Sequence, residues 1–209
     1  MIGMFKANLR PDDTDRFVRP LAALGLHPIG WTVLAVLPAF IGFIMLCWHN
    51  LTWGLTFFVL AGAVDLVDGA VARTMNRVTT LGAYIDGVLD RYVEFLLYLG
   101  LMIYIGSVLF LGIYMEAWFM LLVFGALMTT FVRAYADHRG LVKDQMELKR
   151  MGGLLERGER LALIYLGMLL AIIMSEDWLK LTVVITALLA NLTTLQRIFF
   201  MIKYGMRQN

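Results

Sequence analysis

The sequence predicts an all-α integral membrane protein, with an N-terminal interfacial amphipathic helix followed by six transmembrane helices. The chain has 209 residues, of which 60% are hydrophobic and 16% charged, and its mean hydropathy is +0.75. Soluble domains are about 45–50% apolar and about 25% charged. A soluble fold of this length has too little interior to bury so many apolar side chains. A water-soluble enzyme and a disordered chain are therefore excluded, and the single cysteine, Cys47, excludes a disulfide scaffold and a multi-cysteine metal site.

The first predicted element is a helix on the membrane surface at about 12–26. Phe17, Leu21 and Leu24 recur on one helical face, and aspartates at its start suit a helix N-terminus. Pro20 would bend or break such a helix, so a solvated tail is the alternative. No apolar stretch of a cleavable signal peptide precedes this segment.

Six apolar segments follow, each close to the roughly 20 residues that a membrane-crossing helix needs. They run at about 29–48, 51–73, 80–105, 116–136, 160–175 and 179–203. They define a cytoplasmic N-terminal region (1–28), a transmembrane domain (29–203) and a cytoplasmic tail (204–209).

The distribution of lysine and arginine orients these spans. Both termini, the second–third connection and the fourth–fifth connection are rich in cations. The opposite loops, near 47–50, 106–116 and 175–178, contain neither Lys nor Arg. Because cytoplasmic loops carry the excess of Lys and Arg, both termini are predicted on the cytoplasmic side of the cell membrane.

Four aspartates interrupt the apolar pattern of the second and third spans. Asp65 and Asp68 are three residues apart and Asp86 and Asp90 are four apart, so each pair lies on one helical face. Consecutive antiparallel spans are usually neighbours, and a rise of about 1.5 Å per residue places all four roughly 8–15 Å from the cytoplasmic ends. Ionisable residues inside a membrane are costly and point to a functional site.

Four carboxylates at one place in a low dielectric cannot all ionise unaided. Oxygen ligands of this kind suit hard cations, and two Mg²⁺ (or Mn²⁺) ions would nearly balance four negative charges. A two-metal carboxylate site serves in-line displacement at phosphorus. The alternatives from the residues alone are an ion-coupled carrier and a scaffold with structural ion pairs.

The full pattern resembles the signature of the CDP-alcohol phosphotransferases, also called CDP-alcohol phosphatidyltransferases (class I), over nearly the whole chain. These membrane enzymes join a CDP-activated lipid to an alcohol and release CMP. The matching pattern is Asp65-x2-Asp68-Gly69-x2-Ala72-Arg73-x8-Gly82-x3-Asp86-x3-Asp90.

The resemblance implies a role for each aspartate. Asp65 and Asp86 would bridge two metals, Asp68 would hold one, and Asp90 would hold the other and act as general base. Metal binding would keep Asp90 ionised despite burial, which a base requires.

The resemblance also implies contacts with the CDP-lipid. Gly69, Arg73 and Thr79 match positions that contact the CDP moiety, and the segment Ile29, Gly30, Trp31 and Thr32 matches one that touches the same donor; Ala72 and Gly82 complete the motif. A glycine lets a nucleotide approach the helix, and an arginine fork fits phosphate oxygens.

Arginines in the later spans bear on the acceptor. Arg133, Arg157 and Arg197 are expected to bind an acceptor that carries its own phosphate. This half resembles the phosphatidylinositol-phosphate and archaetidylinositol-phosphate synthases, which use inositol phosphate, although Gly158 stands where many relatives have Pro. Glycerol 3-phosphate is the alternative acceptor, and for Arg157 and Arg160 the positive-inside rule is an alternative explanation. A homodimer in the lipid bilayer and no nucleic-acid partner are expected.

Overall fold

The structure, a computed structural model, describes part of the chain as two compact units. Backbone is described for residues 28–74, 79–142 and 151–206, and side chains for 36–65, 79–142 and 151–206. The first unit ends at Tyr104 and the second begins at Ile105, and each is described by itself. Apart from one short hairpin, the regular structure within these ranges is helical.

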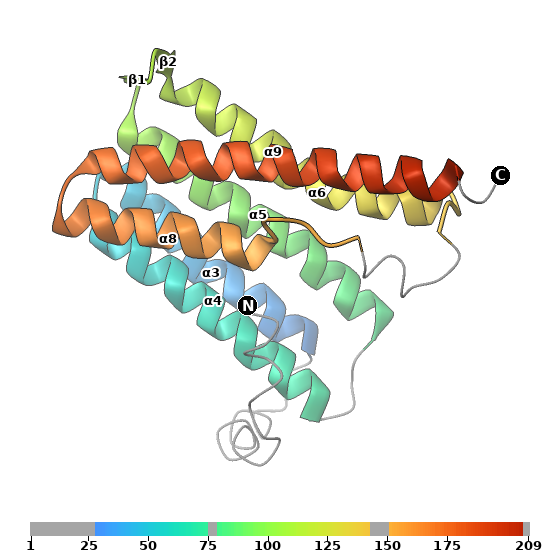
Figure 1. Ribbon diagram of the computed structural model, residues 1–209. Coiled ribbons are helices and arrows are strands. Elements are labelled where there is room, and N and C mark those ends of the chain that lie inside the picture. The colour runs from blue at the N-terminus through green and yellow to red at the C-terminus, as the bar shows by residue number, and fades with distance from the viewer. Residues whose placement is uncertain (1–27, 75–78, 143–150, 207–209) are drawn as a thin grey trace. The chain divides into compact units, whose positions relative to one another are not determined.

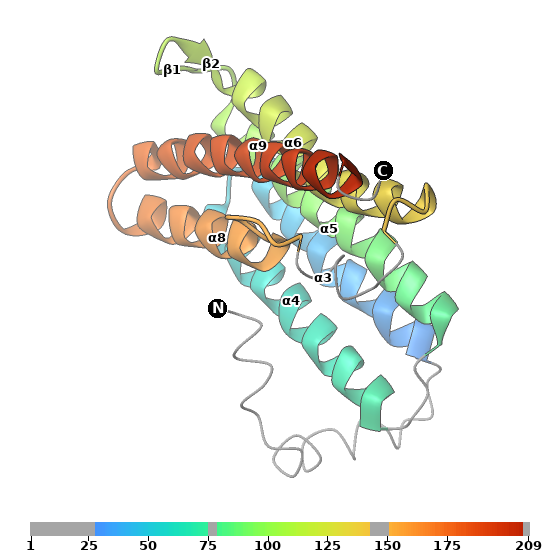
Figure 2. The same cartoon turned by 45° about the vertical axis from the view of Figure 1, so that its right-hand side comes forward.

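The first unit contains α3 (Pro28–Cys47), α4 (Leu51–Thr74) and all of α5 (Thr80–Ile105) except its last residue. Figures 1 and 2 show α3 and α4 side by side, joined by a short turn.

Small residues allow the helices of the first unit to approach closely. A Cβ on Gly42 of α3 would lie 2.9 Å from the ring of Phe58 in α4, and a Cβ on Gly100 of α5 would lie 2.8 Å from Leu46 in α3. Phe58 and Leu46 are fully buried. Close packing at small residues is typical of membrane helices, for which burial from water supplies no force between helices.

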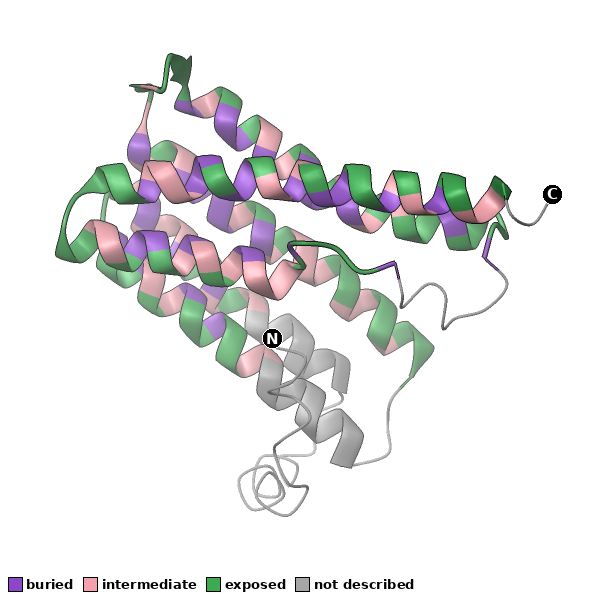
Figure 3. Cartoon of the chain, viewed as in Figure 1, coloured by how far each residue is buried: buried purple, intermediate pink, exposed green. Residues whose placement is uncertain are grey.

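The second unit contains α6 (Met115–His138), α8 (Arg157–Ile173) and α9 (Glu176–Met206). Helix α9 packs against both other helices. Buried positions recur along it every three or four residues, as the purple bands of Figure 3 show, and they include Val183, Ala187, Ala190, Thr194 and Arg197. This spacing is that of one helical face.

A two-stranded hairpin precedes α6, in a connection that the sequence predicted only as a loop. Strand β1 (Leu109–Phe110) pairs antiparallel with β2 (Ile113–Tyr114). The two residues of the turn, Leu111 and Gly112, have φ values of 52° and 77°. Positive φ at both central positions is the type I′ geometry that matches the twist of paired strands. Glycine adopts a positive φ without steric cost, but leucine rarely does. A leucine at position 111 therefore gives no indication of this turn in the sequence.

The helical fold class is confirmed within the described residues. Each of the six predicted spans overlaps one helix, and the boundaries differ by a few residues. Helices α6 and α9 are long and apolar enough to cross a membrane, and shorter apolar stretches occur at Val36–Cys47 and Leu51–Asp65. The predicted interfacial helix at 12–26 lies outside the described residues, and six transmembrane helices stay a prediction.

Candidate functional site

Three of the four predicted metal ligands come together in the first unit. Asp65 of α4 and Asp86 and Asp90 of α5 each offer one carboxylate oxygen, and these oxygens all lie within 4.8 Å of one another. The three residues are half-buried. Two ligands on opposite sides of Mg²⁺, each about 2.0–2.1 Å from the ion, are about 4.2 Å apart. The three oxygens therefore need only small adjustments to share a hard cation, so the donor set and its spacing fit a divalent metal.

For most of the other residues that were predicted to bind a metal or the CDP-lipid donor, the structure describes only the backbone. Asp68, Gly69, Ala72 and Arg73 lie in α4, and the segment from Ile29 to Thr32 lies in α3. The side chains of these residues lie outside the described part.

Thr79 and Gly82 form the start of α5. The Thr79 hydroxyl oxygen accepts a hydrogen bond from the Gly82 backbone N–H at 3.0 Å, the geometry of a threonine N-cap. A Cβ on Gly82 would lie only 3.0 Å from the same oxygen. Because the oxygen is used as an acceptor, the hydroxyl proton remains able to donate. Sequence reasoning assigned Thr79 to the donor and did not foresee its capping role.

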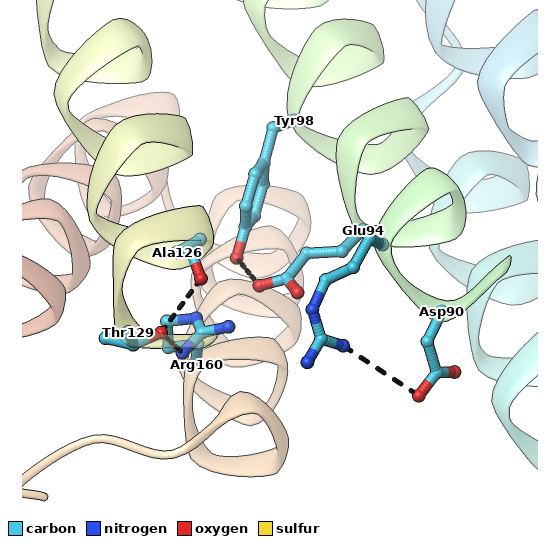
Figure 4. A network of polar contacts seen from close by, with 7 residues as sticks. Asp90, Glu94, Tyr98, Ala126, Thr129 and Arg160 are labelled. Carbon is cyan, nitrogen blue, oxygen red and sulfur yellow. Dashed lines mark hydrogen bonds and ion pairs between the residues drawn. The ribbon is translucent and has the colours of Figure 1, made fainter. Parts of the chain in front are cut away.

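Asp90 has an arginine beside it and a buried carboxyl one turn further along α5. Arg91 Nη1 lies 4.0 Å from Asp90 Oδ2, with both side chains partly exposed. Glu94 is only 2% exposed, and its Oε1 accepts a hydrogen bond from the Tyr98 hydroxyl at 2.8 Å (Figure 4). A partly exposed pair at 4.0 Å contributes little stability, so it does not account for the aspartate cluster.

Sequence reasoning gave Glu94 no role. Asp86, Asp90 and Glu94 recur every four residues and therefore share one face of α5. This spacing is the sequence signal from which a place for Glu94 beside the two aspartates could have been predicted.

In the second unit, two arginines meet at one residue of α6. Arg197 is 8% exposed and Arg160 is 1% exposed. Arg197 Nη1 donates to the backbone carbonyl of Thr129, and Arg160 Nη1 donates to the Thr129 hydroxyl at 3.4 Å. Figure 4 shows Arg160 directed at Thr129, whose hydroxyl donates to the Ala126 carbonyl. We call Arg160, Arg197 and Thr129 the arginine cluster.

The predicted acceptor arginines differ in burial. Arg197 is buried, Arg157 is half-buried and Arg133 is exposed. Arg160, for which the positive-inside rule was an equally good explanation, is the most buried of the four. A charge that only orients a loop has no reason to be buried, because burial of a charge without compensation is costly.

Local sequence explains how α8 presents its arginines. Glu156 is the N-cap and Glu159 the third residue of a capping box, in which each side chain accepts from the other's backbone N–H. One of these bonds runs from Glu156 N to Glu159 Oε2 at 3.0 Å. This cap begins the helix at Arg157 and places Arg157 and Arg160, three residues apart, on one face.

The chain matches curated proteins of known activity over almost its whole length. It is 26% identical to the archaetidylinositol phosphate synthase of Methanothermobacter thermautotrophicus, over 96% of this chain and 93% of that protein. It is 25% identical to the archaetidylinositol phosphate synthase of Pyrococcus horikoshii, over 88% of each.

A solved structure shares the fold. The phosphatidylinositol phosphate synthase of Mycobacterium tuberculosis, crystallised with CDP-DAG bound, superposes with a TM-score of 0.75. The match covers 90% of this chain and 92% of that one at 23% identity. The CDP-alcohol phosphatidyltransferase family model matches residues 26–195. The family resemblance carried by the aspartate motif is thereby confirmed: the chain belongs to the CDP-alcohol phosphatidyltransferase family of transferases.

Proposed function

We propose that this protein transfers the phosphatidyl or archaetidyl group of a CDP-linked lipid to a hydroxyl of inositol phosphate and releases CMP. The observation that carries the proposal is the convergence of Asp65, Asp86 and Asp90 oxygens within 4.8 Å, in a chain of this family. The curated relatives named above, which are archaetidylinositol phosphate synthases, support the acceptor.

The proposed cofactors are two Mg²⁺ or Mn²⁺ ions. Asp65 and Asp86 would bridge them, Asp68 would hold one and Asp90 the other. Bound ions of this kind withdraw charge from a diphosphate and stabilise a departing phosphate. A crystal structure of the M. tuberculosis synthase in complex with manganese and citrate supports a divalent ion.

The donor is proposed to bind across the start of α5 and the end of α4. The Thr79 hydroxyl proton would donate to a diphosphate oxygen, since its oxygen already accepts from Gly82 N–H. Arg73 would add a cationic fork, Gly69 would let the nucleotide approach, and the segment from Ile29 to Thr32 would touch the same donor. Binding of CDP-DAG by the M. tuberculosis synthase supports a CDP-lipid donor.

Asp90 is the proposed general base. As the acceptor oxygen attacks the β-phosphorus, Asp90 takes the hydroxyl proton, a new P–O bond forms, and the bond from the β-phosphorus to the oxygen of CMP breaks. A carboxylate held at the proposed metal site would be competent for this step when it is ionised and within reach of the acceptor hydroxyl.

The acceptor phosphate is proposed to bind at the arginine cluster, with Arg133 and Arg157. The two described hydrogen bonds of Arg197 go to neutral carbonyl oxygens, and Glu156 acts on it as an opposite charge while Arg133 and Arg160 act as like charges. A buried cation of this kind is stabilised by an anion, and a phosphate matches the guanidinium fork. Glycerol 3-phosphate would satisfy the same arginines and is the second candidate acceptor.

The membrane arrangement is part of the proposal. Six transmembrane helices would form the domain 29–203, preceded by the cytoplasmic region 1–28 with its interfacial helix and followed by the tail 204–209. Both termini and the mouth of the site would be cytoplasmic, and the protein would form a homodimer. The absence of Lys and Arg from the three opposite loops supports this orientation.

The test is CMP release by the purified protein from CDP-diacylglycerol and from CDP-archaeol. We expect release with inositol phosphate and Mg²⁺ or Mn²⁺, and none with free inositol, which has the same ring without the phosphate. Chelation of the metal should abolish release and its return should restore it. Release with glycerol 3-phosphate but not with inositol phosphate would identify glycerol 3-phosphate as the acceptor. Ion flux across proteoliposomes without CMP release would support a carrier instead.

A further inference from the structure

We propose that Asn191 and Thr194 of α9 are positioning residues for the acceptor phosphate. They set the register of α9 against α6 and thereby place the arginine cluster. The inference rests on the proposed function for the identity of the acceptor, but its evidence lies in the contacts between these two helices.

Three polar side chains of α9 contact three backbone carbonyls of α6. Asn191 Nδ2 donates to the Leu121 carbonyl at 2.9 Å and Thr194 Oγ1 lies 3.4 Å from the Gly125 carbonyl. Arg197 Nη1 donates to the Thr129 carbonyl. The donors are three residues apart on α9 and the acceptors four apart on α6, which is how ridges of one helix fit grooves of another. We call these three contacts the α6–α9 ladder.

The ladder donors are themselves held in place. The second Nδ2 proton of Asn191 donates to the Ala187 carbonyl at 2.8 Å, and the single hydroxyl proton of Thr194 is shared between the Gly125 carbonyl and the Ala190 carbonyl, which lies 3.1 Å away. Gly125 permits the close approach, since a Cβ there would lie 2.6 Å from Asn191 Nδ2. A register shift would break the ladder contacts and move α9 away from this glycine.

The ladder matters because apolar packing fixes register weakly in a membrane. Lipid tails are as apolar as leucine side chains, so small residues and hydrogen bonds decide how two spans align. Sliding α9 by one residue would move Arg197 by about 1.5 Å along the helix axis. A displacement of that size is enough to disturb a bidentate phosphate contact.

The same helix also holds the segment that leads into α8. Thr193 Oγ1 accepts from the Leu155 N–H at 3.1 Å, Gln196 Oε1 accepts from the Leu154 N–H at 3.3 Å, and Arg197 Nε donates to the Gly152 carbonyl. The register of α9 therefore also sets the position of the start of α8 relative to α9. Through α8 it places Arg157 and Arg160.

The experiment measures KM and kcat for acceptor and donor in Thr194→Val, Asn191→Ala and the double variant. Thr194→Val keeps the shape of the side chain and removes the donor, and Asn191→Ala removes the donor without adding bulk. We expect each single variant to raise the KM for inositol phosphate about threefold to tenfold and the double variant to raise it further. The KM for CDP-lipid and kcat at saturating acceptor should stay within about twofold, because the ladder lies on the acceptor side.

Thr186→Val is the matched control. Thr186 is fully buried on the same helix, but its hydroxyl donates to the Thr182 carbonyl of α9 itself. This variant should keep the acceptor KM of the wild type, and Thr194→Ser, which retains the hydroxyl, should restore it. An equal rise in Thr186→Val, or a wild-type KM in the double variant, would overturn the positioning role.

Calorimetric titration of inositol phosphate into the same proteins separates this inference from the proposed function. Wild-type binding that weakens in the ladder variants supports the ladder even if no CMP is released, an outcome that would contradict the proposed function alone. If wild-type protein binds no inositol phosphate, both are overturned.

Discussion

At the scale of single residues, the chemistry of Asp90 depends on its neighbours. Its carboxylate shares a site with oxygens of Asp65 and Asp86, and Arg91 Nη1 lies 4.0 Å from its Oδ2. Nearby cations favour the ionised form of a carboxylate, whereas nearby carboxylates favour the protonated form. Bound divalent ions would decide this balance in favour of a carboxylate that can accept a proton.

The first prediction is that Asp90→Asn lowers acceptor-dependent CMP release by about a hundredfold to ten-thousandfold. The carboxamide oxygen can still face a cation, but the side chain can no longer take a proton. CMP release is measured at saturating CDP-lipid, with thermal unfolding in detergent as the check on folding. Asp137→Asn, a change at an exposed aspartate of α6, should retain activity, and a fully active Asp90→Asn would contradict the assigned base.

At the scale of helices, Gly125 shows why close approach is needed between α6 and α9. A Cβ at this position would lie 2.6 Å from Asn191 Nδ2, 3.0 Å from Asn191 Cγ and 3.1 Å from Ala190 Cβ. An added methyl must push the two helices apart or displace the Asn191 side chain from its two hydrogen bonds.

The second prediction is that Gly125→Ala destabilises the protein by about 1–3 kcal/mol and lowers the midpoint of thermal unfolding in detergent. Gly62→Ala is the matched control, because a Cβ there meets no atom within 4 Å. Alanine also favours a helix over glycine, so this control should melt no lower than wild type. A Gly125→Ala variant that melts as high as Gly62→Ala would show that the helices are not in close contact there.

At the scale of the whole molecule, the placement of charge is more informative than its amount. The described helices are largely apolar, and two of them are long and apolar enough to cross a membrane. The cations gather in alternate connections, and the buried arginines and half-buried aspartates lie toward the ends of the spans that are predicted to be cytoplasmic. Phosphate chemistry at the inner face of a membrane needs charges at that depth.

The third prediction concerns membrane topology. Cys47 is the only cysteine, so a Cys47→Ser protein provides a cysteine-free background. In that background we expect Ser107→Cys, an exposed position before the hairpin, to react with a membrane-impermeant maleimide only from the outer side. Asn209→Cys should react only from the cytoplasmic side. Labelling of both positions from the same side would contradict the six-span topology.

Prediction from sequence succeeded where the signal is periodic. The helices follow from apolar segments of spanning length, and the aspartate cluster follows from spacings of three and four residues. The sequence did not predict that Thr79 caps a helix, that a hairpin precedes α6 or that Arg160 is buried. Each of these depends on contacts or backbone angles that residue identity alone does not specify.

The sequence by itself therefore determined the membrane class, the helices, the family and the candidate metal ligands. Apolar length and the spacing of charged residues follow from short-range helix geometry, which acts the same way wherever the helix lies. Only the tertiary structure decided that Arg160 and Arg197 meet at Thr129 and that Asn191 and Thr194 join α9 to α6. These pairs lie far apart in the chain, and in a membrane the register that brings them together is set by hydrogen bonds and small residues rather than by apolar burial.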